Sequence, residues 1–146
     1  MKWELTTIVD LEIVVKAVLE KLEKNLELEQ ATVLALHGDL GAGKTTFMQT
    51  LARHLKVTET VTSPTFVVMK IYDLYDQSWD KLIHIDAYRI EEVDEMRPLG
   101  FDELLKRKGT IIGIEWAEKI ESLLPKNTVH LNFSVAGNHH QITLLE

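Results

Sequence analysis

Apolar side chains recur along this chain with helical spacing in two segments. The first, residues 7–26, has one apolar face and one polar face, and Thr7 with Asp10 resembles a capping box at its start. Its apolar face comprises Ile13, Val14, Ala17, Val18 and Leu22. The same spacing returns from Thr45 onward and predicts a second helix. The apolar positions of that helix are Phe47, Met48, Leu51, Ala52 and Leu55.

Uninterrupted and alternating apolar runs predict the strands. Residues 32–37 form a continuous apolar run with β-branched members, which is typical of a central parallel strand buried on both faces. The other predicted strands are 66–72, 82–85, 110–114, 129–135 and 141–145, and short helices are predicted over 91–96, 101–106 and 116–123. The polar tip 76–80 indicates a hairpin between two of these strands. Strands that alternate with helices, followed by two strands in succession, predict an α/β fold. We expect three layers of the P-loop NTPase type: a mixed, mainly parallel sheet, helices on both faces and antiparallel strands at the C-terminal end.

A glycine-rich segment lies between the first predicted strand and the second helix. It reads Gly38-Asp39-Leu40-Gly41-Ala42-Gly43-Lys44-Thr45 and matches G-x-x-x-x-G-K-[ST] at every required position. Glycines let backbone N–H groups converge on phosphate oxygens, and the following helix directs its positive dipole end at them. Lys44 adds a cation, and the Thr45 hydroxyl is suited to Mg²⁺. The segment therefore predicts a site that binds a nucleoside triphosphate with Mg²⁺ and hydrolyses it.

Two carboxylates follow predicted strands, where open α/β sheets place their ligands. Asp86 follows the run 82–85 and Glu115 follows 110–114, so either is a candidate to hold Mg²⁺ or orient the attacking group. A helix cap or a turn residue is the alternative reading of each. Thr65, in Ser63-Pro64-Thr65-Phe66, is placed to reach the γ-phosphate or its metal, although a tight turn entering a strand explains that segment more simply.

Other polar and aromatic residues have simpler interpretations. His37 and His84 lie within apolar runs and are expected to be hydrogen-bonded core residues. His139 and His140 follow Gly137 in a predicted turn and are expected to be solvated, with contact to the nucleotide base as the alternative. Trp116 is expected to pack, although an aromatic side chain at a ligand crevice also stacks on rings.

Composition narrows the class of protein further. The 146 residues are 45% hydrophobic, which suits a single P-loop ATPase domain over residues 1–146. No apolar run is long enough to span a membrane and the N-terminus lacks a signal-peptide layout, so we expect a cytoplasmic protein. The chain has no cysteine, which leaves oxygen or imidazole ligands for a metal and favours Mg²⁺. A net charge of -7 argues against broad nucleic-acid binding.

Taken in order, the motifs resemble those of the bacterial TsaE (YjeE) family. They are Gly38 to Phe47, Ser63-Pro64-Thr65-Phe66, His84-Ile85-Asp86-Ala87-Tyr88-Arg89 and Ile114-Glu115-Trp116, and together they span nearly the whole chain. The resemblance implies an ATPase that binds ATP or ADP with Mg²⁺ and supports threonylcarbamoyladenosine synthesis in tRNA. Its partners would be the TsaD and TsaB proteins, tRNA would be reached only through that complex, and no membrane would be involved.

The resemblance also implies roles for individual residues. The segment from Gly38 to Thr46 would bind the nucleotide, with Lys44 on the phosphates. Thr45 and Glu115 would ligate Mg²⁺, while Asp86 and Thr65 would organise the metal, the water or the γ-phosphate. Trp116 would lie beside the site, and the start of the first helix, near Thr7 and Asp10, would be a further nucleotide contact. Family members carry a late Gly-Arg pair near the nucleotide, for which this chain has Gly137-Asn138, so Asn138 becomes a candidate contact.

Two other classes of function remain open on this reading. A small-molecule kinase also transfers phosphate from a P-loop, but the segment 91–103 that would form its lid is acidic and contains only Arg97 as a cation. A nucleotide-sensing module would bind without turnover. A GTPase is disfavoured because the guanine-reading Asn-Lys-x-Asp segment is absent from the sequence.

Overall fold

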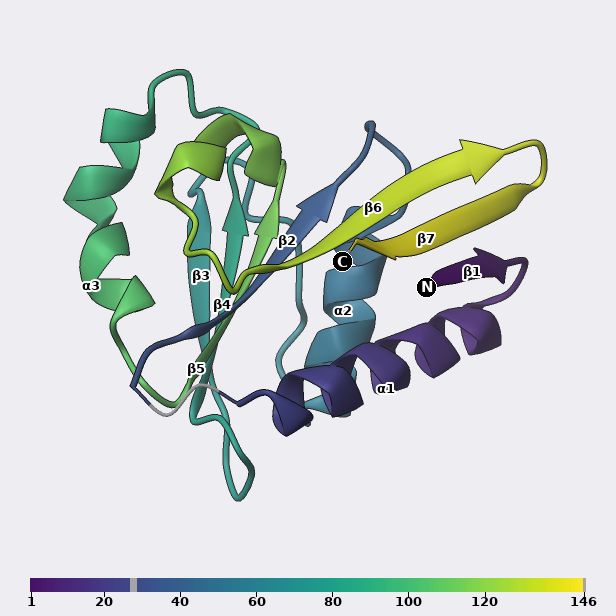
Figure 1. The fold of residues 1–146 in the computed structure, drawn as a ribbon, viewed down its shortest axis with the longest axis horizontal. Coiled ribbons are helices and arrows are strands. Elements are labelled where there is room, and N and C mark those ends of the chain that lie inside the picture. The colour runs from purple at the N-terminus through teal and green to yellow at the C-terminus, as the bar shows by residue number, and fades with distance from the viewer. Residues whose placement is uncertain (27–28, 146) are drawn as a thin grey trace.

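A seven-stranded mixed sheet organises the computed structural model, which describes residues 1–26 and 29–145 (Figure 1). The strand order is β1-β7-β6-β2-β5-β4-β3. The strands are β1 (Lys2–Leu5), β2 (Thr32–His37), β3 (Met69–Asp73), β4 (Lys81–Asp86), β5 (Thr110–Glu115), β6 (Val129–Ala136) and β7 (His139–Leu145). β2 pairs in parallel with β5 and β6, and β4 with β5, whereas β1–β7, β6–β7 and β3–β4 are antiparallel. The mixed sheet and the antiparallel C-terminal strands confirm the predicted fold class.

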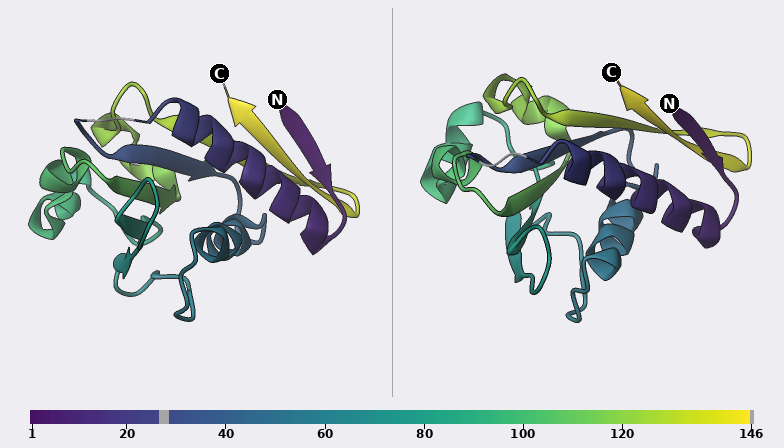
Figure 2. Two further views of the ribbon diagram at one scale, coloured as in Figure 1. Left: turned by 90° about the horizontal axis from the view of Figure 1, so that it is seen from below. Right: turned by 60° about the horizontal axis from the view of Figure 1, so that its bottom comes forward.

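Two long helices cover one face of the sheet (Figure 2). Helix α1 (Ile8–Lys24) begins at the predicted capping box, in which the backbone N–H of Thr7 donates to Asp10 Oδ2 over 3.0 Å. Helix α2 (Lys44–His54) follows β2 and buries the apolar positions predicted for it. The buried face of α1 differs from the expected one because Ile13 is 59% exposed. Its buried residues are Leu11, Val14, Val15, Val18 and Leu22.

Short helical segments cover the other face. They are η1 (Val93–Leu99), α3 (Phe101–Leu105) and η2 (Ala117–Leu123), and η1 and η2 are 3₁₀ in type. Met96, Phe101 and Ile120 pack with strand residues into a second apolar cluster. β2 alternates between the two layers, because Leu34 faces the long helices and Val33 faces the short ones. The sheet is therefore buried on both faces around β2, as its continuous apolar run predicts.

The structure corrects the expected start of β3. The strand begins at Met69 rather than Phe66, since the N–H groups of Val67 and Val68 both donate to the carbonyl oxygen of Pro64 in a turn. Val68 has a φ of 69°, which no extended strand allows. Phe66 is consequently exposed at 81% rather than paired in the sheet.

Three further features differ from the sequence expectations. β1 was not predicted, and it forms a short edge strand whose Trp3 is opposite Ile142 of β7. Trp79 lies in the predicted polar tip but is buried, with its Nε1–H donating to Thr32 Oγ1 over 3.2 Å. His139 and His140 belong to β7 rather than to the turn before it.

Among the described helices, none is long and apolar enough to cross a membrane.

Candidate functional site

The glycine-rich loop lies at the carboxyl end of β2 and leads directly into α2. Gly43 precedes the helix with a φ of 107°, and the helix has no side-chain cap, so its first N–H groups are available to an anion. Gly38 has a φ of 142°, and a Cβ built there would lie 2.3 Å from the carbonyl oxygen of Phe133. The loop therefore has backbone conformations and a close approach to β6 that require glycine.

Lys44 lies inside this loop with only 4% of its surface exposed. Its ammonium donates to the carbonyl oxygen of Gly38 and, over 3.0 Å, to that of Asp39. The same nitrogen lies 4.0 Å from the centroid of the Trp116 ring. Burial lowers the pKa of Lys44 from its ordinary value, and nearby carboxylates, Glu118 first among them, oppose that shift. A phosphate entering the loop would meet a desolvated cation.

Thr45 and Glu115 meet at the bottom of the site. The Thr45 hydroxyl donates to Glu115 Oε1 over 2.7 Å, although the two residues are 70 positions apart in sequence. The other carboxylate oxygen, Oε2, lies 2.6 Å from Nε2 of His84, which is fully buried as predicted. Glu115 is itself 97% buried, since its exposure is 3%. The structure therefore pairs Glu115 with the hydroxyl that the loop motif marks as a metal ligand.

Asp86 lies beside Glu115 because the parallel pairing of β4 with β5 sets these two residues opposite one another. Asp86 Oδ2 accepts hydrogen bonds from Ser63 Oγ at 3.0 Å and Thr65 Oγ1 at 2.9 Å. Its Oδ1 accepts the N–H of Tyr88 at 2.9 Å, so Asp86 also has the turn-stabilising role that was the alternative. The segment around Thr65 is a turn, and that turn delivers a hydroxyl to the carboxylate.

A cavity of about 340 Å³ joins these groups. Its lining includes Lys44, Thr45, Thr65, Asp86, Glu115 and Trp116, together with loop residues 40–43 and Thr46. All the predicted catalytic residues are thus brought together from four parts of the chain. Three predicted nucleotide contacts are not in this lining: Gly38 and Asp39 line a separate cavity beside β6, and Asn138 lies in the turn after β6.

The donor set fits Mg²⁺. The oxygens that line the cavity include the carboxylates of Asp86 and Glu115 and several hydroxyls, among them that of Thr45. Over residues 1–26 and 29–145, no group of three or more histidine or acidic side chains forms a cage around a cation. Mg²⁺ suits such a sparse set because it keeps several waters and takes its other ligands from substrate phosphates.

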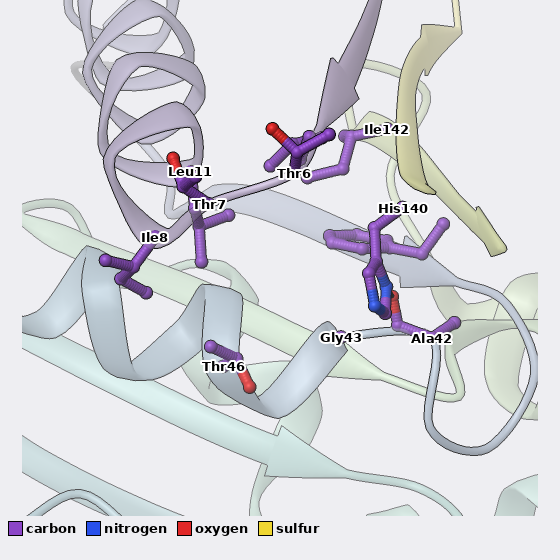
Figure 3. A pocket seen from close by; sticks show the side chains of 11 residues that line it. Thr6, Thr7, Ile8, Leu11, Ala42, Gly43, Thr46, His140 and Ile142 are labelled. Atoms are coloured by element: carbon purple, nitrogen blue, oxygen red, sulfur yellow. Dashed lines mark hydrogen bonds between the residues drawn. The ribbon is translucent and has the colours of Figure 1, made fainter. Parts of the chain in front are cut away.

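A second cavity, of about 230 Å³, opens on the other side of the loop, between the start of α1, the start of α2 and β7 (Figure 3). Ala42, Gly43 and Thr46 line both cavities, so the two are adjacent. Nδ1 of His140 lies 3.3 Å from the carbonyl oxygen of Ala42. The remaining lining is mostly apolar and comprises Leu5, Thr6, Thr7, Ile8, Leu11, Phe133 and Ile142.

The sequence analysis predicted only a small part of the lining of this second cavity. His140 is exposed as predicted, but it lies on β7 rather than in the turn, and Leu5 reaches the cavity through β1, a strand that the sequence does not predict. The usable signals were the helix start at Thr7 and the alternation of apolar residues along 141–145. Neither shows by itself that β1 and β7 pair beside the loop.

The fold and the loop together define a P-loop NTPase-like protein, and comparison with known proteins identifies its family. The family model described as "Threonylcarbamoyl adenosine biosynthesis protein TsaE" matches residues 12–142. The chain belongs to the TsaE family, which is named for a role in threonylcarbamoyladenosine biosynthesis.

Individual relatives agree with this assignment. The TsaE protein of Bacillus subtilis is 42% identical over 106 residues, covering 73% of this chain and 63% of that protein, which is less than two thirds of its length. The TsaE protein of Treponema pallidum is 36% identical over 118 residues, covering 80% of this chain and 84% of the relative. The crystal structure of Bacillus subtilis YdiB superposes with a TM-score of 0.74 at 31% identity, covering 99% of this chain and 83% of YdiB.

Proposed function

We propose that this chain is a Mg²⁺-dependent ATPase that supports N6-threonylcarbamoyladenosine modification of tRNA together with TsaD and TsaB. The observation that carries the proposal is the single cavity in which Lys44, Thr45, Thr65, Asp86 and Glu115 converge. Membership of the TsaE family supports the pathway, and the wording of the relatives' names supports tRNA as the molecule finally modified.

Each residue has a role that its surroundings support. The first N–H groups of α2 and the Lys44 ammonium bind the phosphates and offset their negative charge. Thr45 and Glu115 would hold Mg²⁺, which neutralises charge on the phosphate oxygens when it is bound. Asp86 accepts hydrogen bonds from the hydroxyl groups of Ser63 and Thr65, and an attacking water in that position would be oriented by the same carboxylate.

We assign the base of the nucleotide to the second cavity. Its volume of about 230 Å³ lies directly beside the phosphate loop, and its mostly apolar walls suit the faces of a flat aromatic ring. Thr6, Thr7 and His140 add polar groups at the rim (Figure 3). Adenine is the base that TsaE membership favours.

A kinase would need cations in a lid over the phosphates, and Arg97 is the one cation in the segment 91–103. Arg97 lies on η1, and its side chain is 78% exposed and 3.5 Å from Asp94. The deciding measurement is phosphate release from ATP with and without small hydroxyl acceptors. Release to water supports the ATPase, transfer to an acceptor would indicate a kinase, and tight binding without either product would indicate a sensor.

We expect the Thr65 turn to respond to the partner proteins. Arg89 lies beside this turn, with its guanidinium 4.5 Å from the centroid of the exposed Phe66 ring, and it is not among the residues that line the phosphate cavity. Isolated protein should therefore hydrolyse ATP slowly, and TsaD with TsaB should accelerate it at least about 10-fold by ordering the turn or supplying a cation.

The substitution Thr65→Ala separates the two rates. We expect it to reduce the stimulated phosphate release at least about 10-fold and the basal rate much less, because partner binding orders the turn that carries Thr65. Thr60→Ala, in the same loop but outside the cavity lining, is the matched control and should be stimulated like wild type. Equal stimulation of Thr65→Ala and Thr60→Ala would contradict the role given to Thr65.

The substitution Glu115→Ala tests whether Glu115 is a ligand of Mg²⁺. We expect the Mg²⁺ concentration at half-maximal hydrolysis to rise at least about 10-fold, because a carboxylate ligand and the partner of Thr45 are lost together. ADP binding without metal should change little, since the loop amides and Lys44 remain. An unchanged Mg²⁺ titration would transfer the role of direct ligand to Asp86.

A further inference from the structure

His84 is the buried polar residue whose contacts the proposed chemistry does not yet use. It lies on β4 with no exposed surface, two residues before Asp86. Its Nε2 is 2.6 Å from Glu115 Oε2, which is among the shortest side-chain contacts in the site. Its Nδ1 is buried, and among the described residues it has no hydrogen-bond partner.

These contacts determine which ring nitrogen carries the proton. An ionised carboxylate only accepts hydrogen bonds, so the short contact to Glu115 requires a proton on Nε2. A proton on Nδ1 would be a buried donor without an acceptor, which folded proteins rarely contain. The arrangement therefore favours a ring that donates from Nε2 to Glu115 and leaves Nδ1 as an unused lone pair.

The sheet makes this contact possible. In the parallel register of β4 and β5, His84 is opposite Gly113, and Glu115 is the next residue on the same face of β5. Gly113 has no side chain to stand between them, and the space above it is filled by Met48 of α2, whose Cε would lie 2.4 Å from a Cβ at that position. The imidazole of β4 thus reaches diagonally to the carboxylate on the adjacent strand β5.

We infer that His84 is a positioning residue, which fixes the Glu115 carboxylate in the orientation that Mg²⁺ requires. Thr45 donates to Oε1 and His84 to Oε2, so both oxygens are restrained and the remaining lone pairs are left for the cation or its waters. A donor behind a ligating group raises metal affinity by limiting that group to one orientation. The inference rests on the proposed Mg²⁺-dependent function.

The test compares His84→Met, which keeps the volume and removes the donor, with His84→Gln, which keeps an N–H at similar reach. For each variant the Mg²⁺ concentration at half-saturation is measured on the ADP complex by calorimetry, alongside metal-free ADP affinity and melting temperature. We expect His84→Met to raise the Mg²⁺ midpoint about 10-fold or more while metal-free ADP affinity stays within about twofold. His84→Gln should recover most of the loss.

Thr110→Val is the matched control. Thr110 starts β5 at the opposite end from Glu115, is fully buried, and has a hydroxyl with no partner among the described residues. Its replacement perturbs the same strand without touching the site, so its Mg²⁺ midpoint should equal that of wild type. A wild-type midpoint in a folded His84→Met, or an equal loss in Thr110→Val, would overturn the inference.

Nitrogen NMR of wild-type protein provides a test that does not depend on a variant folding. We expect His84 to show a protonated Nε2 and an unprotonated Nδ1, and the Nε2–H resonance to move when Mg²⁺ is added to the ADP complex. A proton on Nδ1, or a resonance unaffected by Mg²⁺, would overturn the inference. Wild-type protein that binds neither ADP nor Mg²⁺ would instead overturn the proposed function on which it rests.

Discussion

Replacing Lys44 with methionine is expected to reduce ATP hydrolysis by at least about 100-fold, because a cation aimed at charge developing on the phosphates contributes on that scale. Methionine keeps most of the aliphatic stem of Lys44 and removes the ammonium that lies 4.0 Å from the centroid of the Trp116 ring. The fold should survive the change, and the melting temperature should stay equal or rise, since burial disfavours the charged form of this lysine.

The measurement is phosphate release at saturating Mg-ATP, with circular dichroism as the check on folding. Lys70→Met is the matched control, because Lys70 is exposed on the edge strand β3, away from the cavity, and should hydrolyse ATP at the wild-type rate. If Lys44→Met and Lys70→Met hydrolysed ATP at the same rate, Lys44 would not be the cation that binds the phosphates.

Gly38→Ala is expected to have the largest effect on stability. Its Cβ would lie 2.3 Å from the backbone oxygen of Phe133, and backbone cannot rotate away as a side chain does. The φ of 142° adds strain for any residue with a Cβ. Together these effects should lower the free energy of unfolding by about 3 kcal/mol or more. In a chain of this length that corresponds to a fall of about 10 °C in melting temperature.

Gly137→Ala is the control for backbone strain alone. Gly137 also has a positive φ, of 62°, but a Cβ there would meet nothing within 4 Å. We expect a loss of about 1 kcal/mol, measured by urea unfolding of both variants. Similar losses in the two variants would mean that the loop moves away from β6 without cost, and the close approach at Gly38 would then have no structural importance.

Local patterns alone predicted much of this protein. The continuous apolar run of β2, the glycine loop and the helical spacing after Thr45 are each properties of a short segment, and all three were confirmed in the structure. The capping box at Thr7 was confirmed for the same reason, since its two hydrogen bonds join residues three apart. The family was also recognisable at this level, because it depends on short motifs in order.

Local patterns failed where burial depends on distant segments. Trp79 was expected in a polar tip, but Thr32 of another strand accepts its N–H and the core encloses its ring. Ile13 has the right spacing for the buried face of α1, yet no neighbour covers it. The strand expected from Phe66 begins later, because the Pro64 carbonyl oxygen binds two N–H groups that a strand would have used.

The sequence predicted the candidate residues one by one, but only the tertiary structure showed which of them contact one another. Asp86 and Glu115 are adjacent because β4 and β5 pair in a register that the sequence does not state. Strand order also decides two other features. These are the contact of His84 with Glu115 and the position of His140 in the lining of the second cavity. Strand order and register are set by the packing of whole faces against the helices, which is a long-range effect. The sequence by itself therefore determined most of the elements and the glycine-rich loop, and only the tertiary structure decided which side chains share the site.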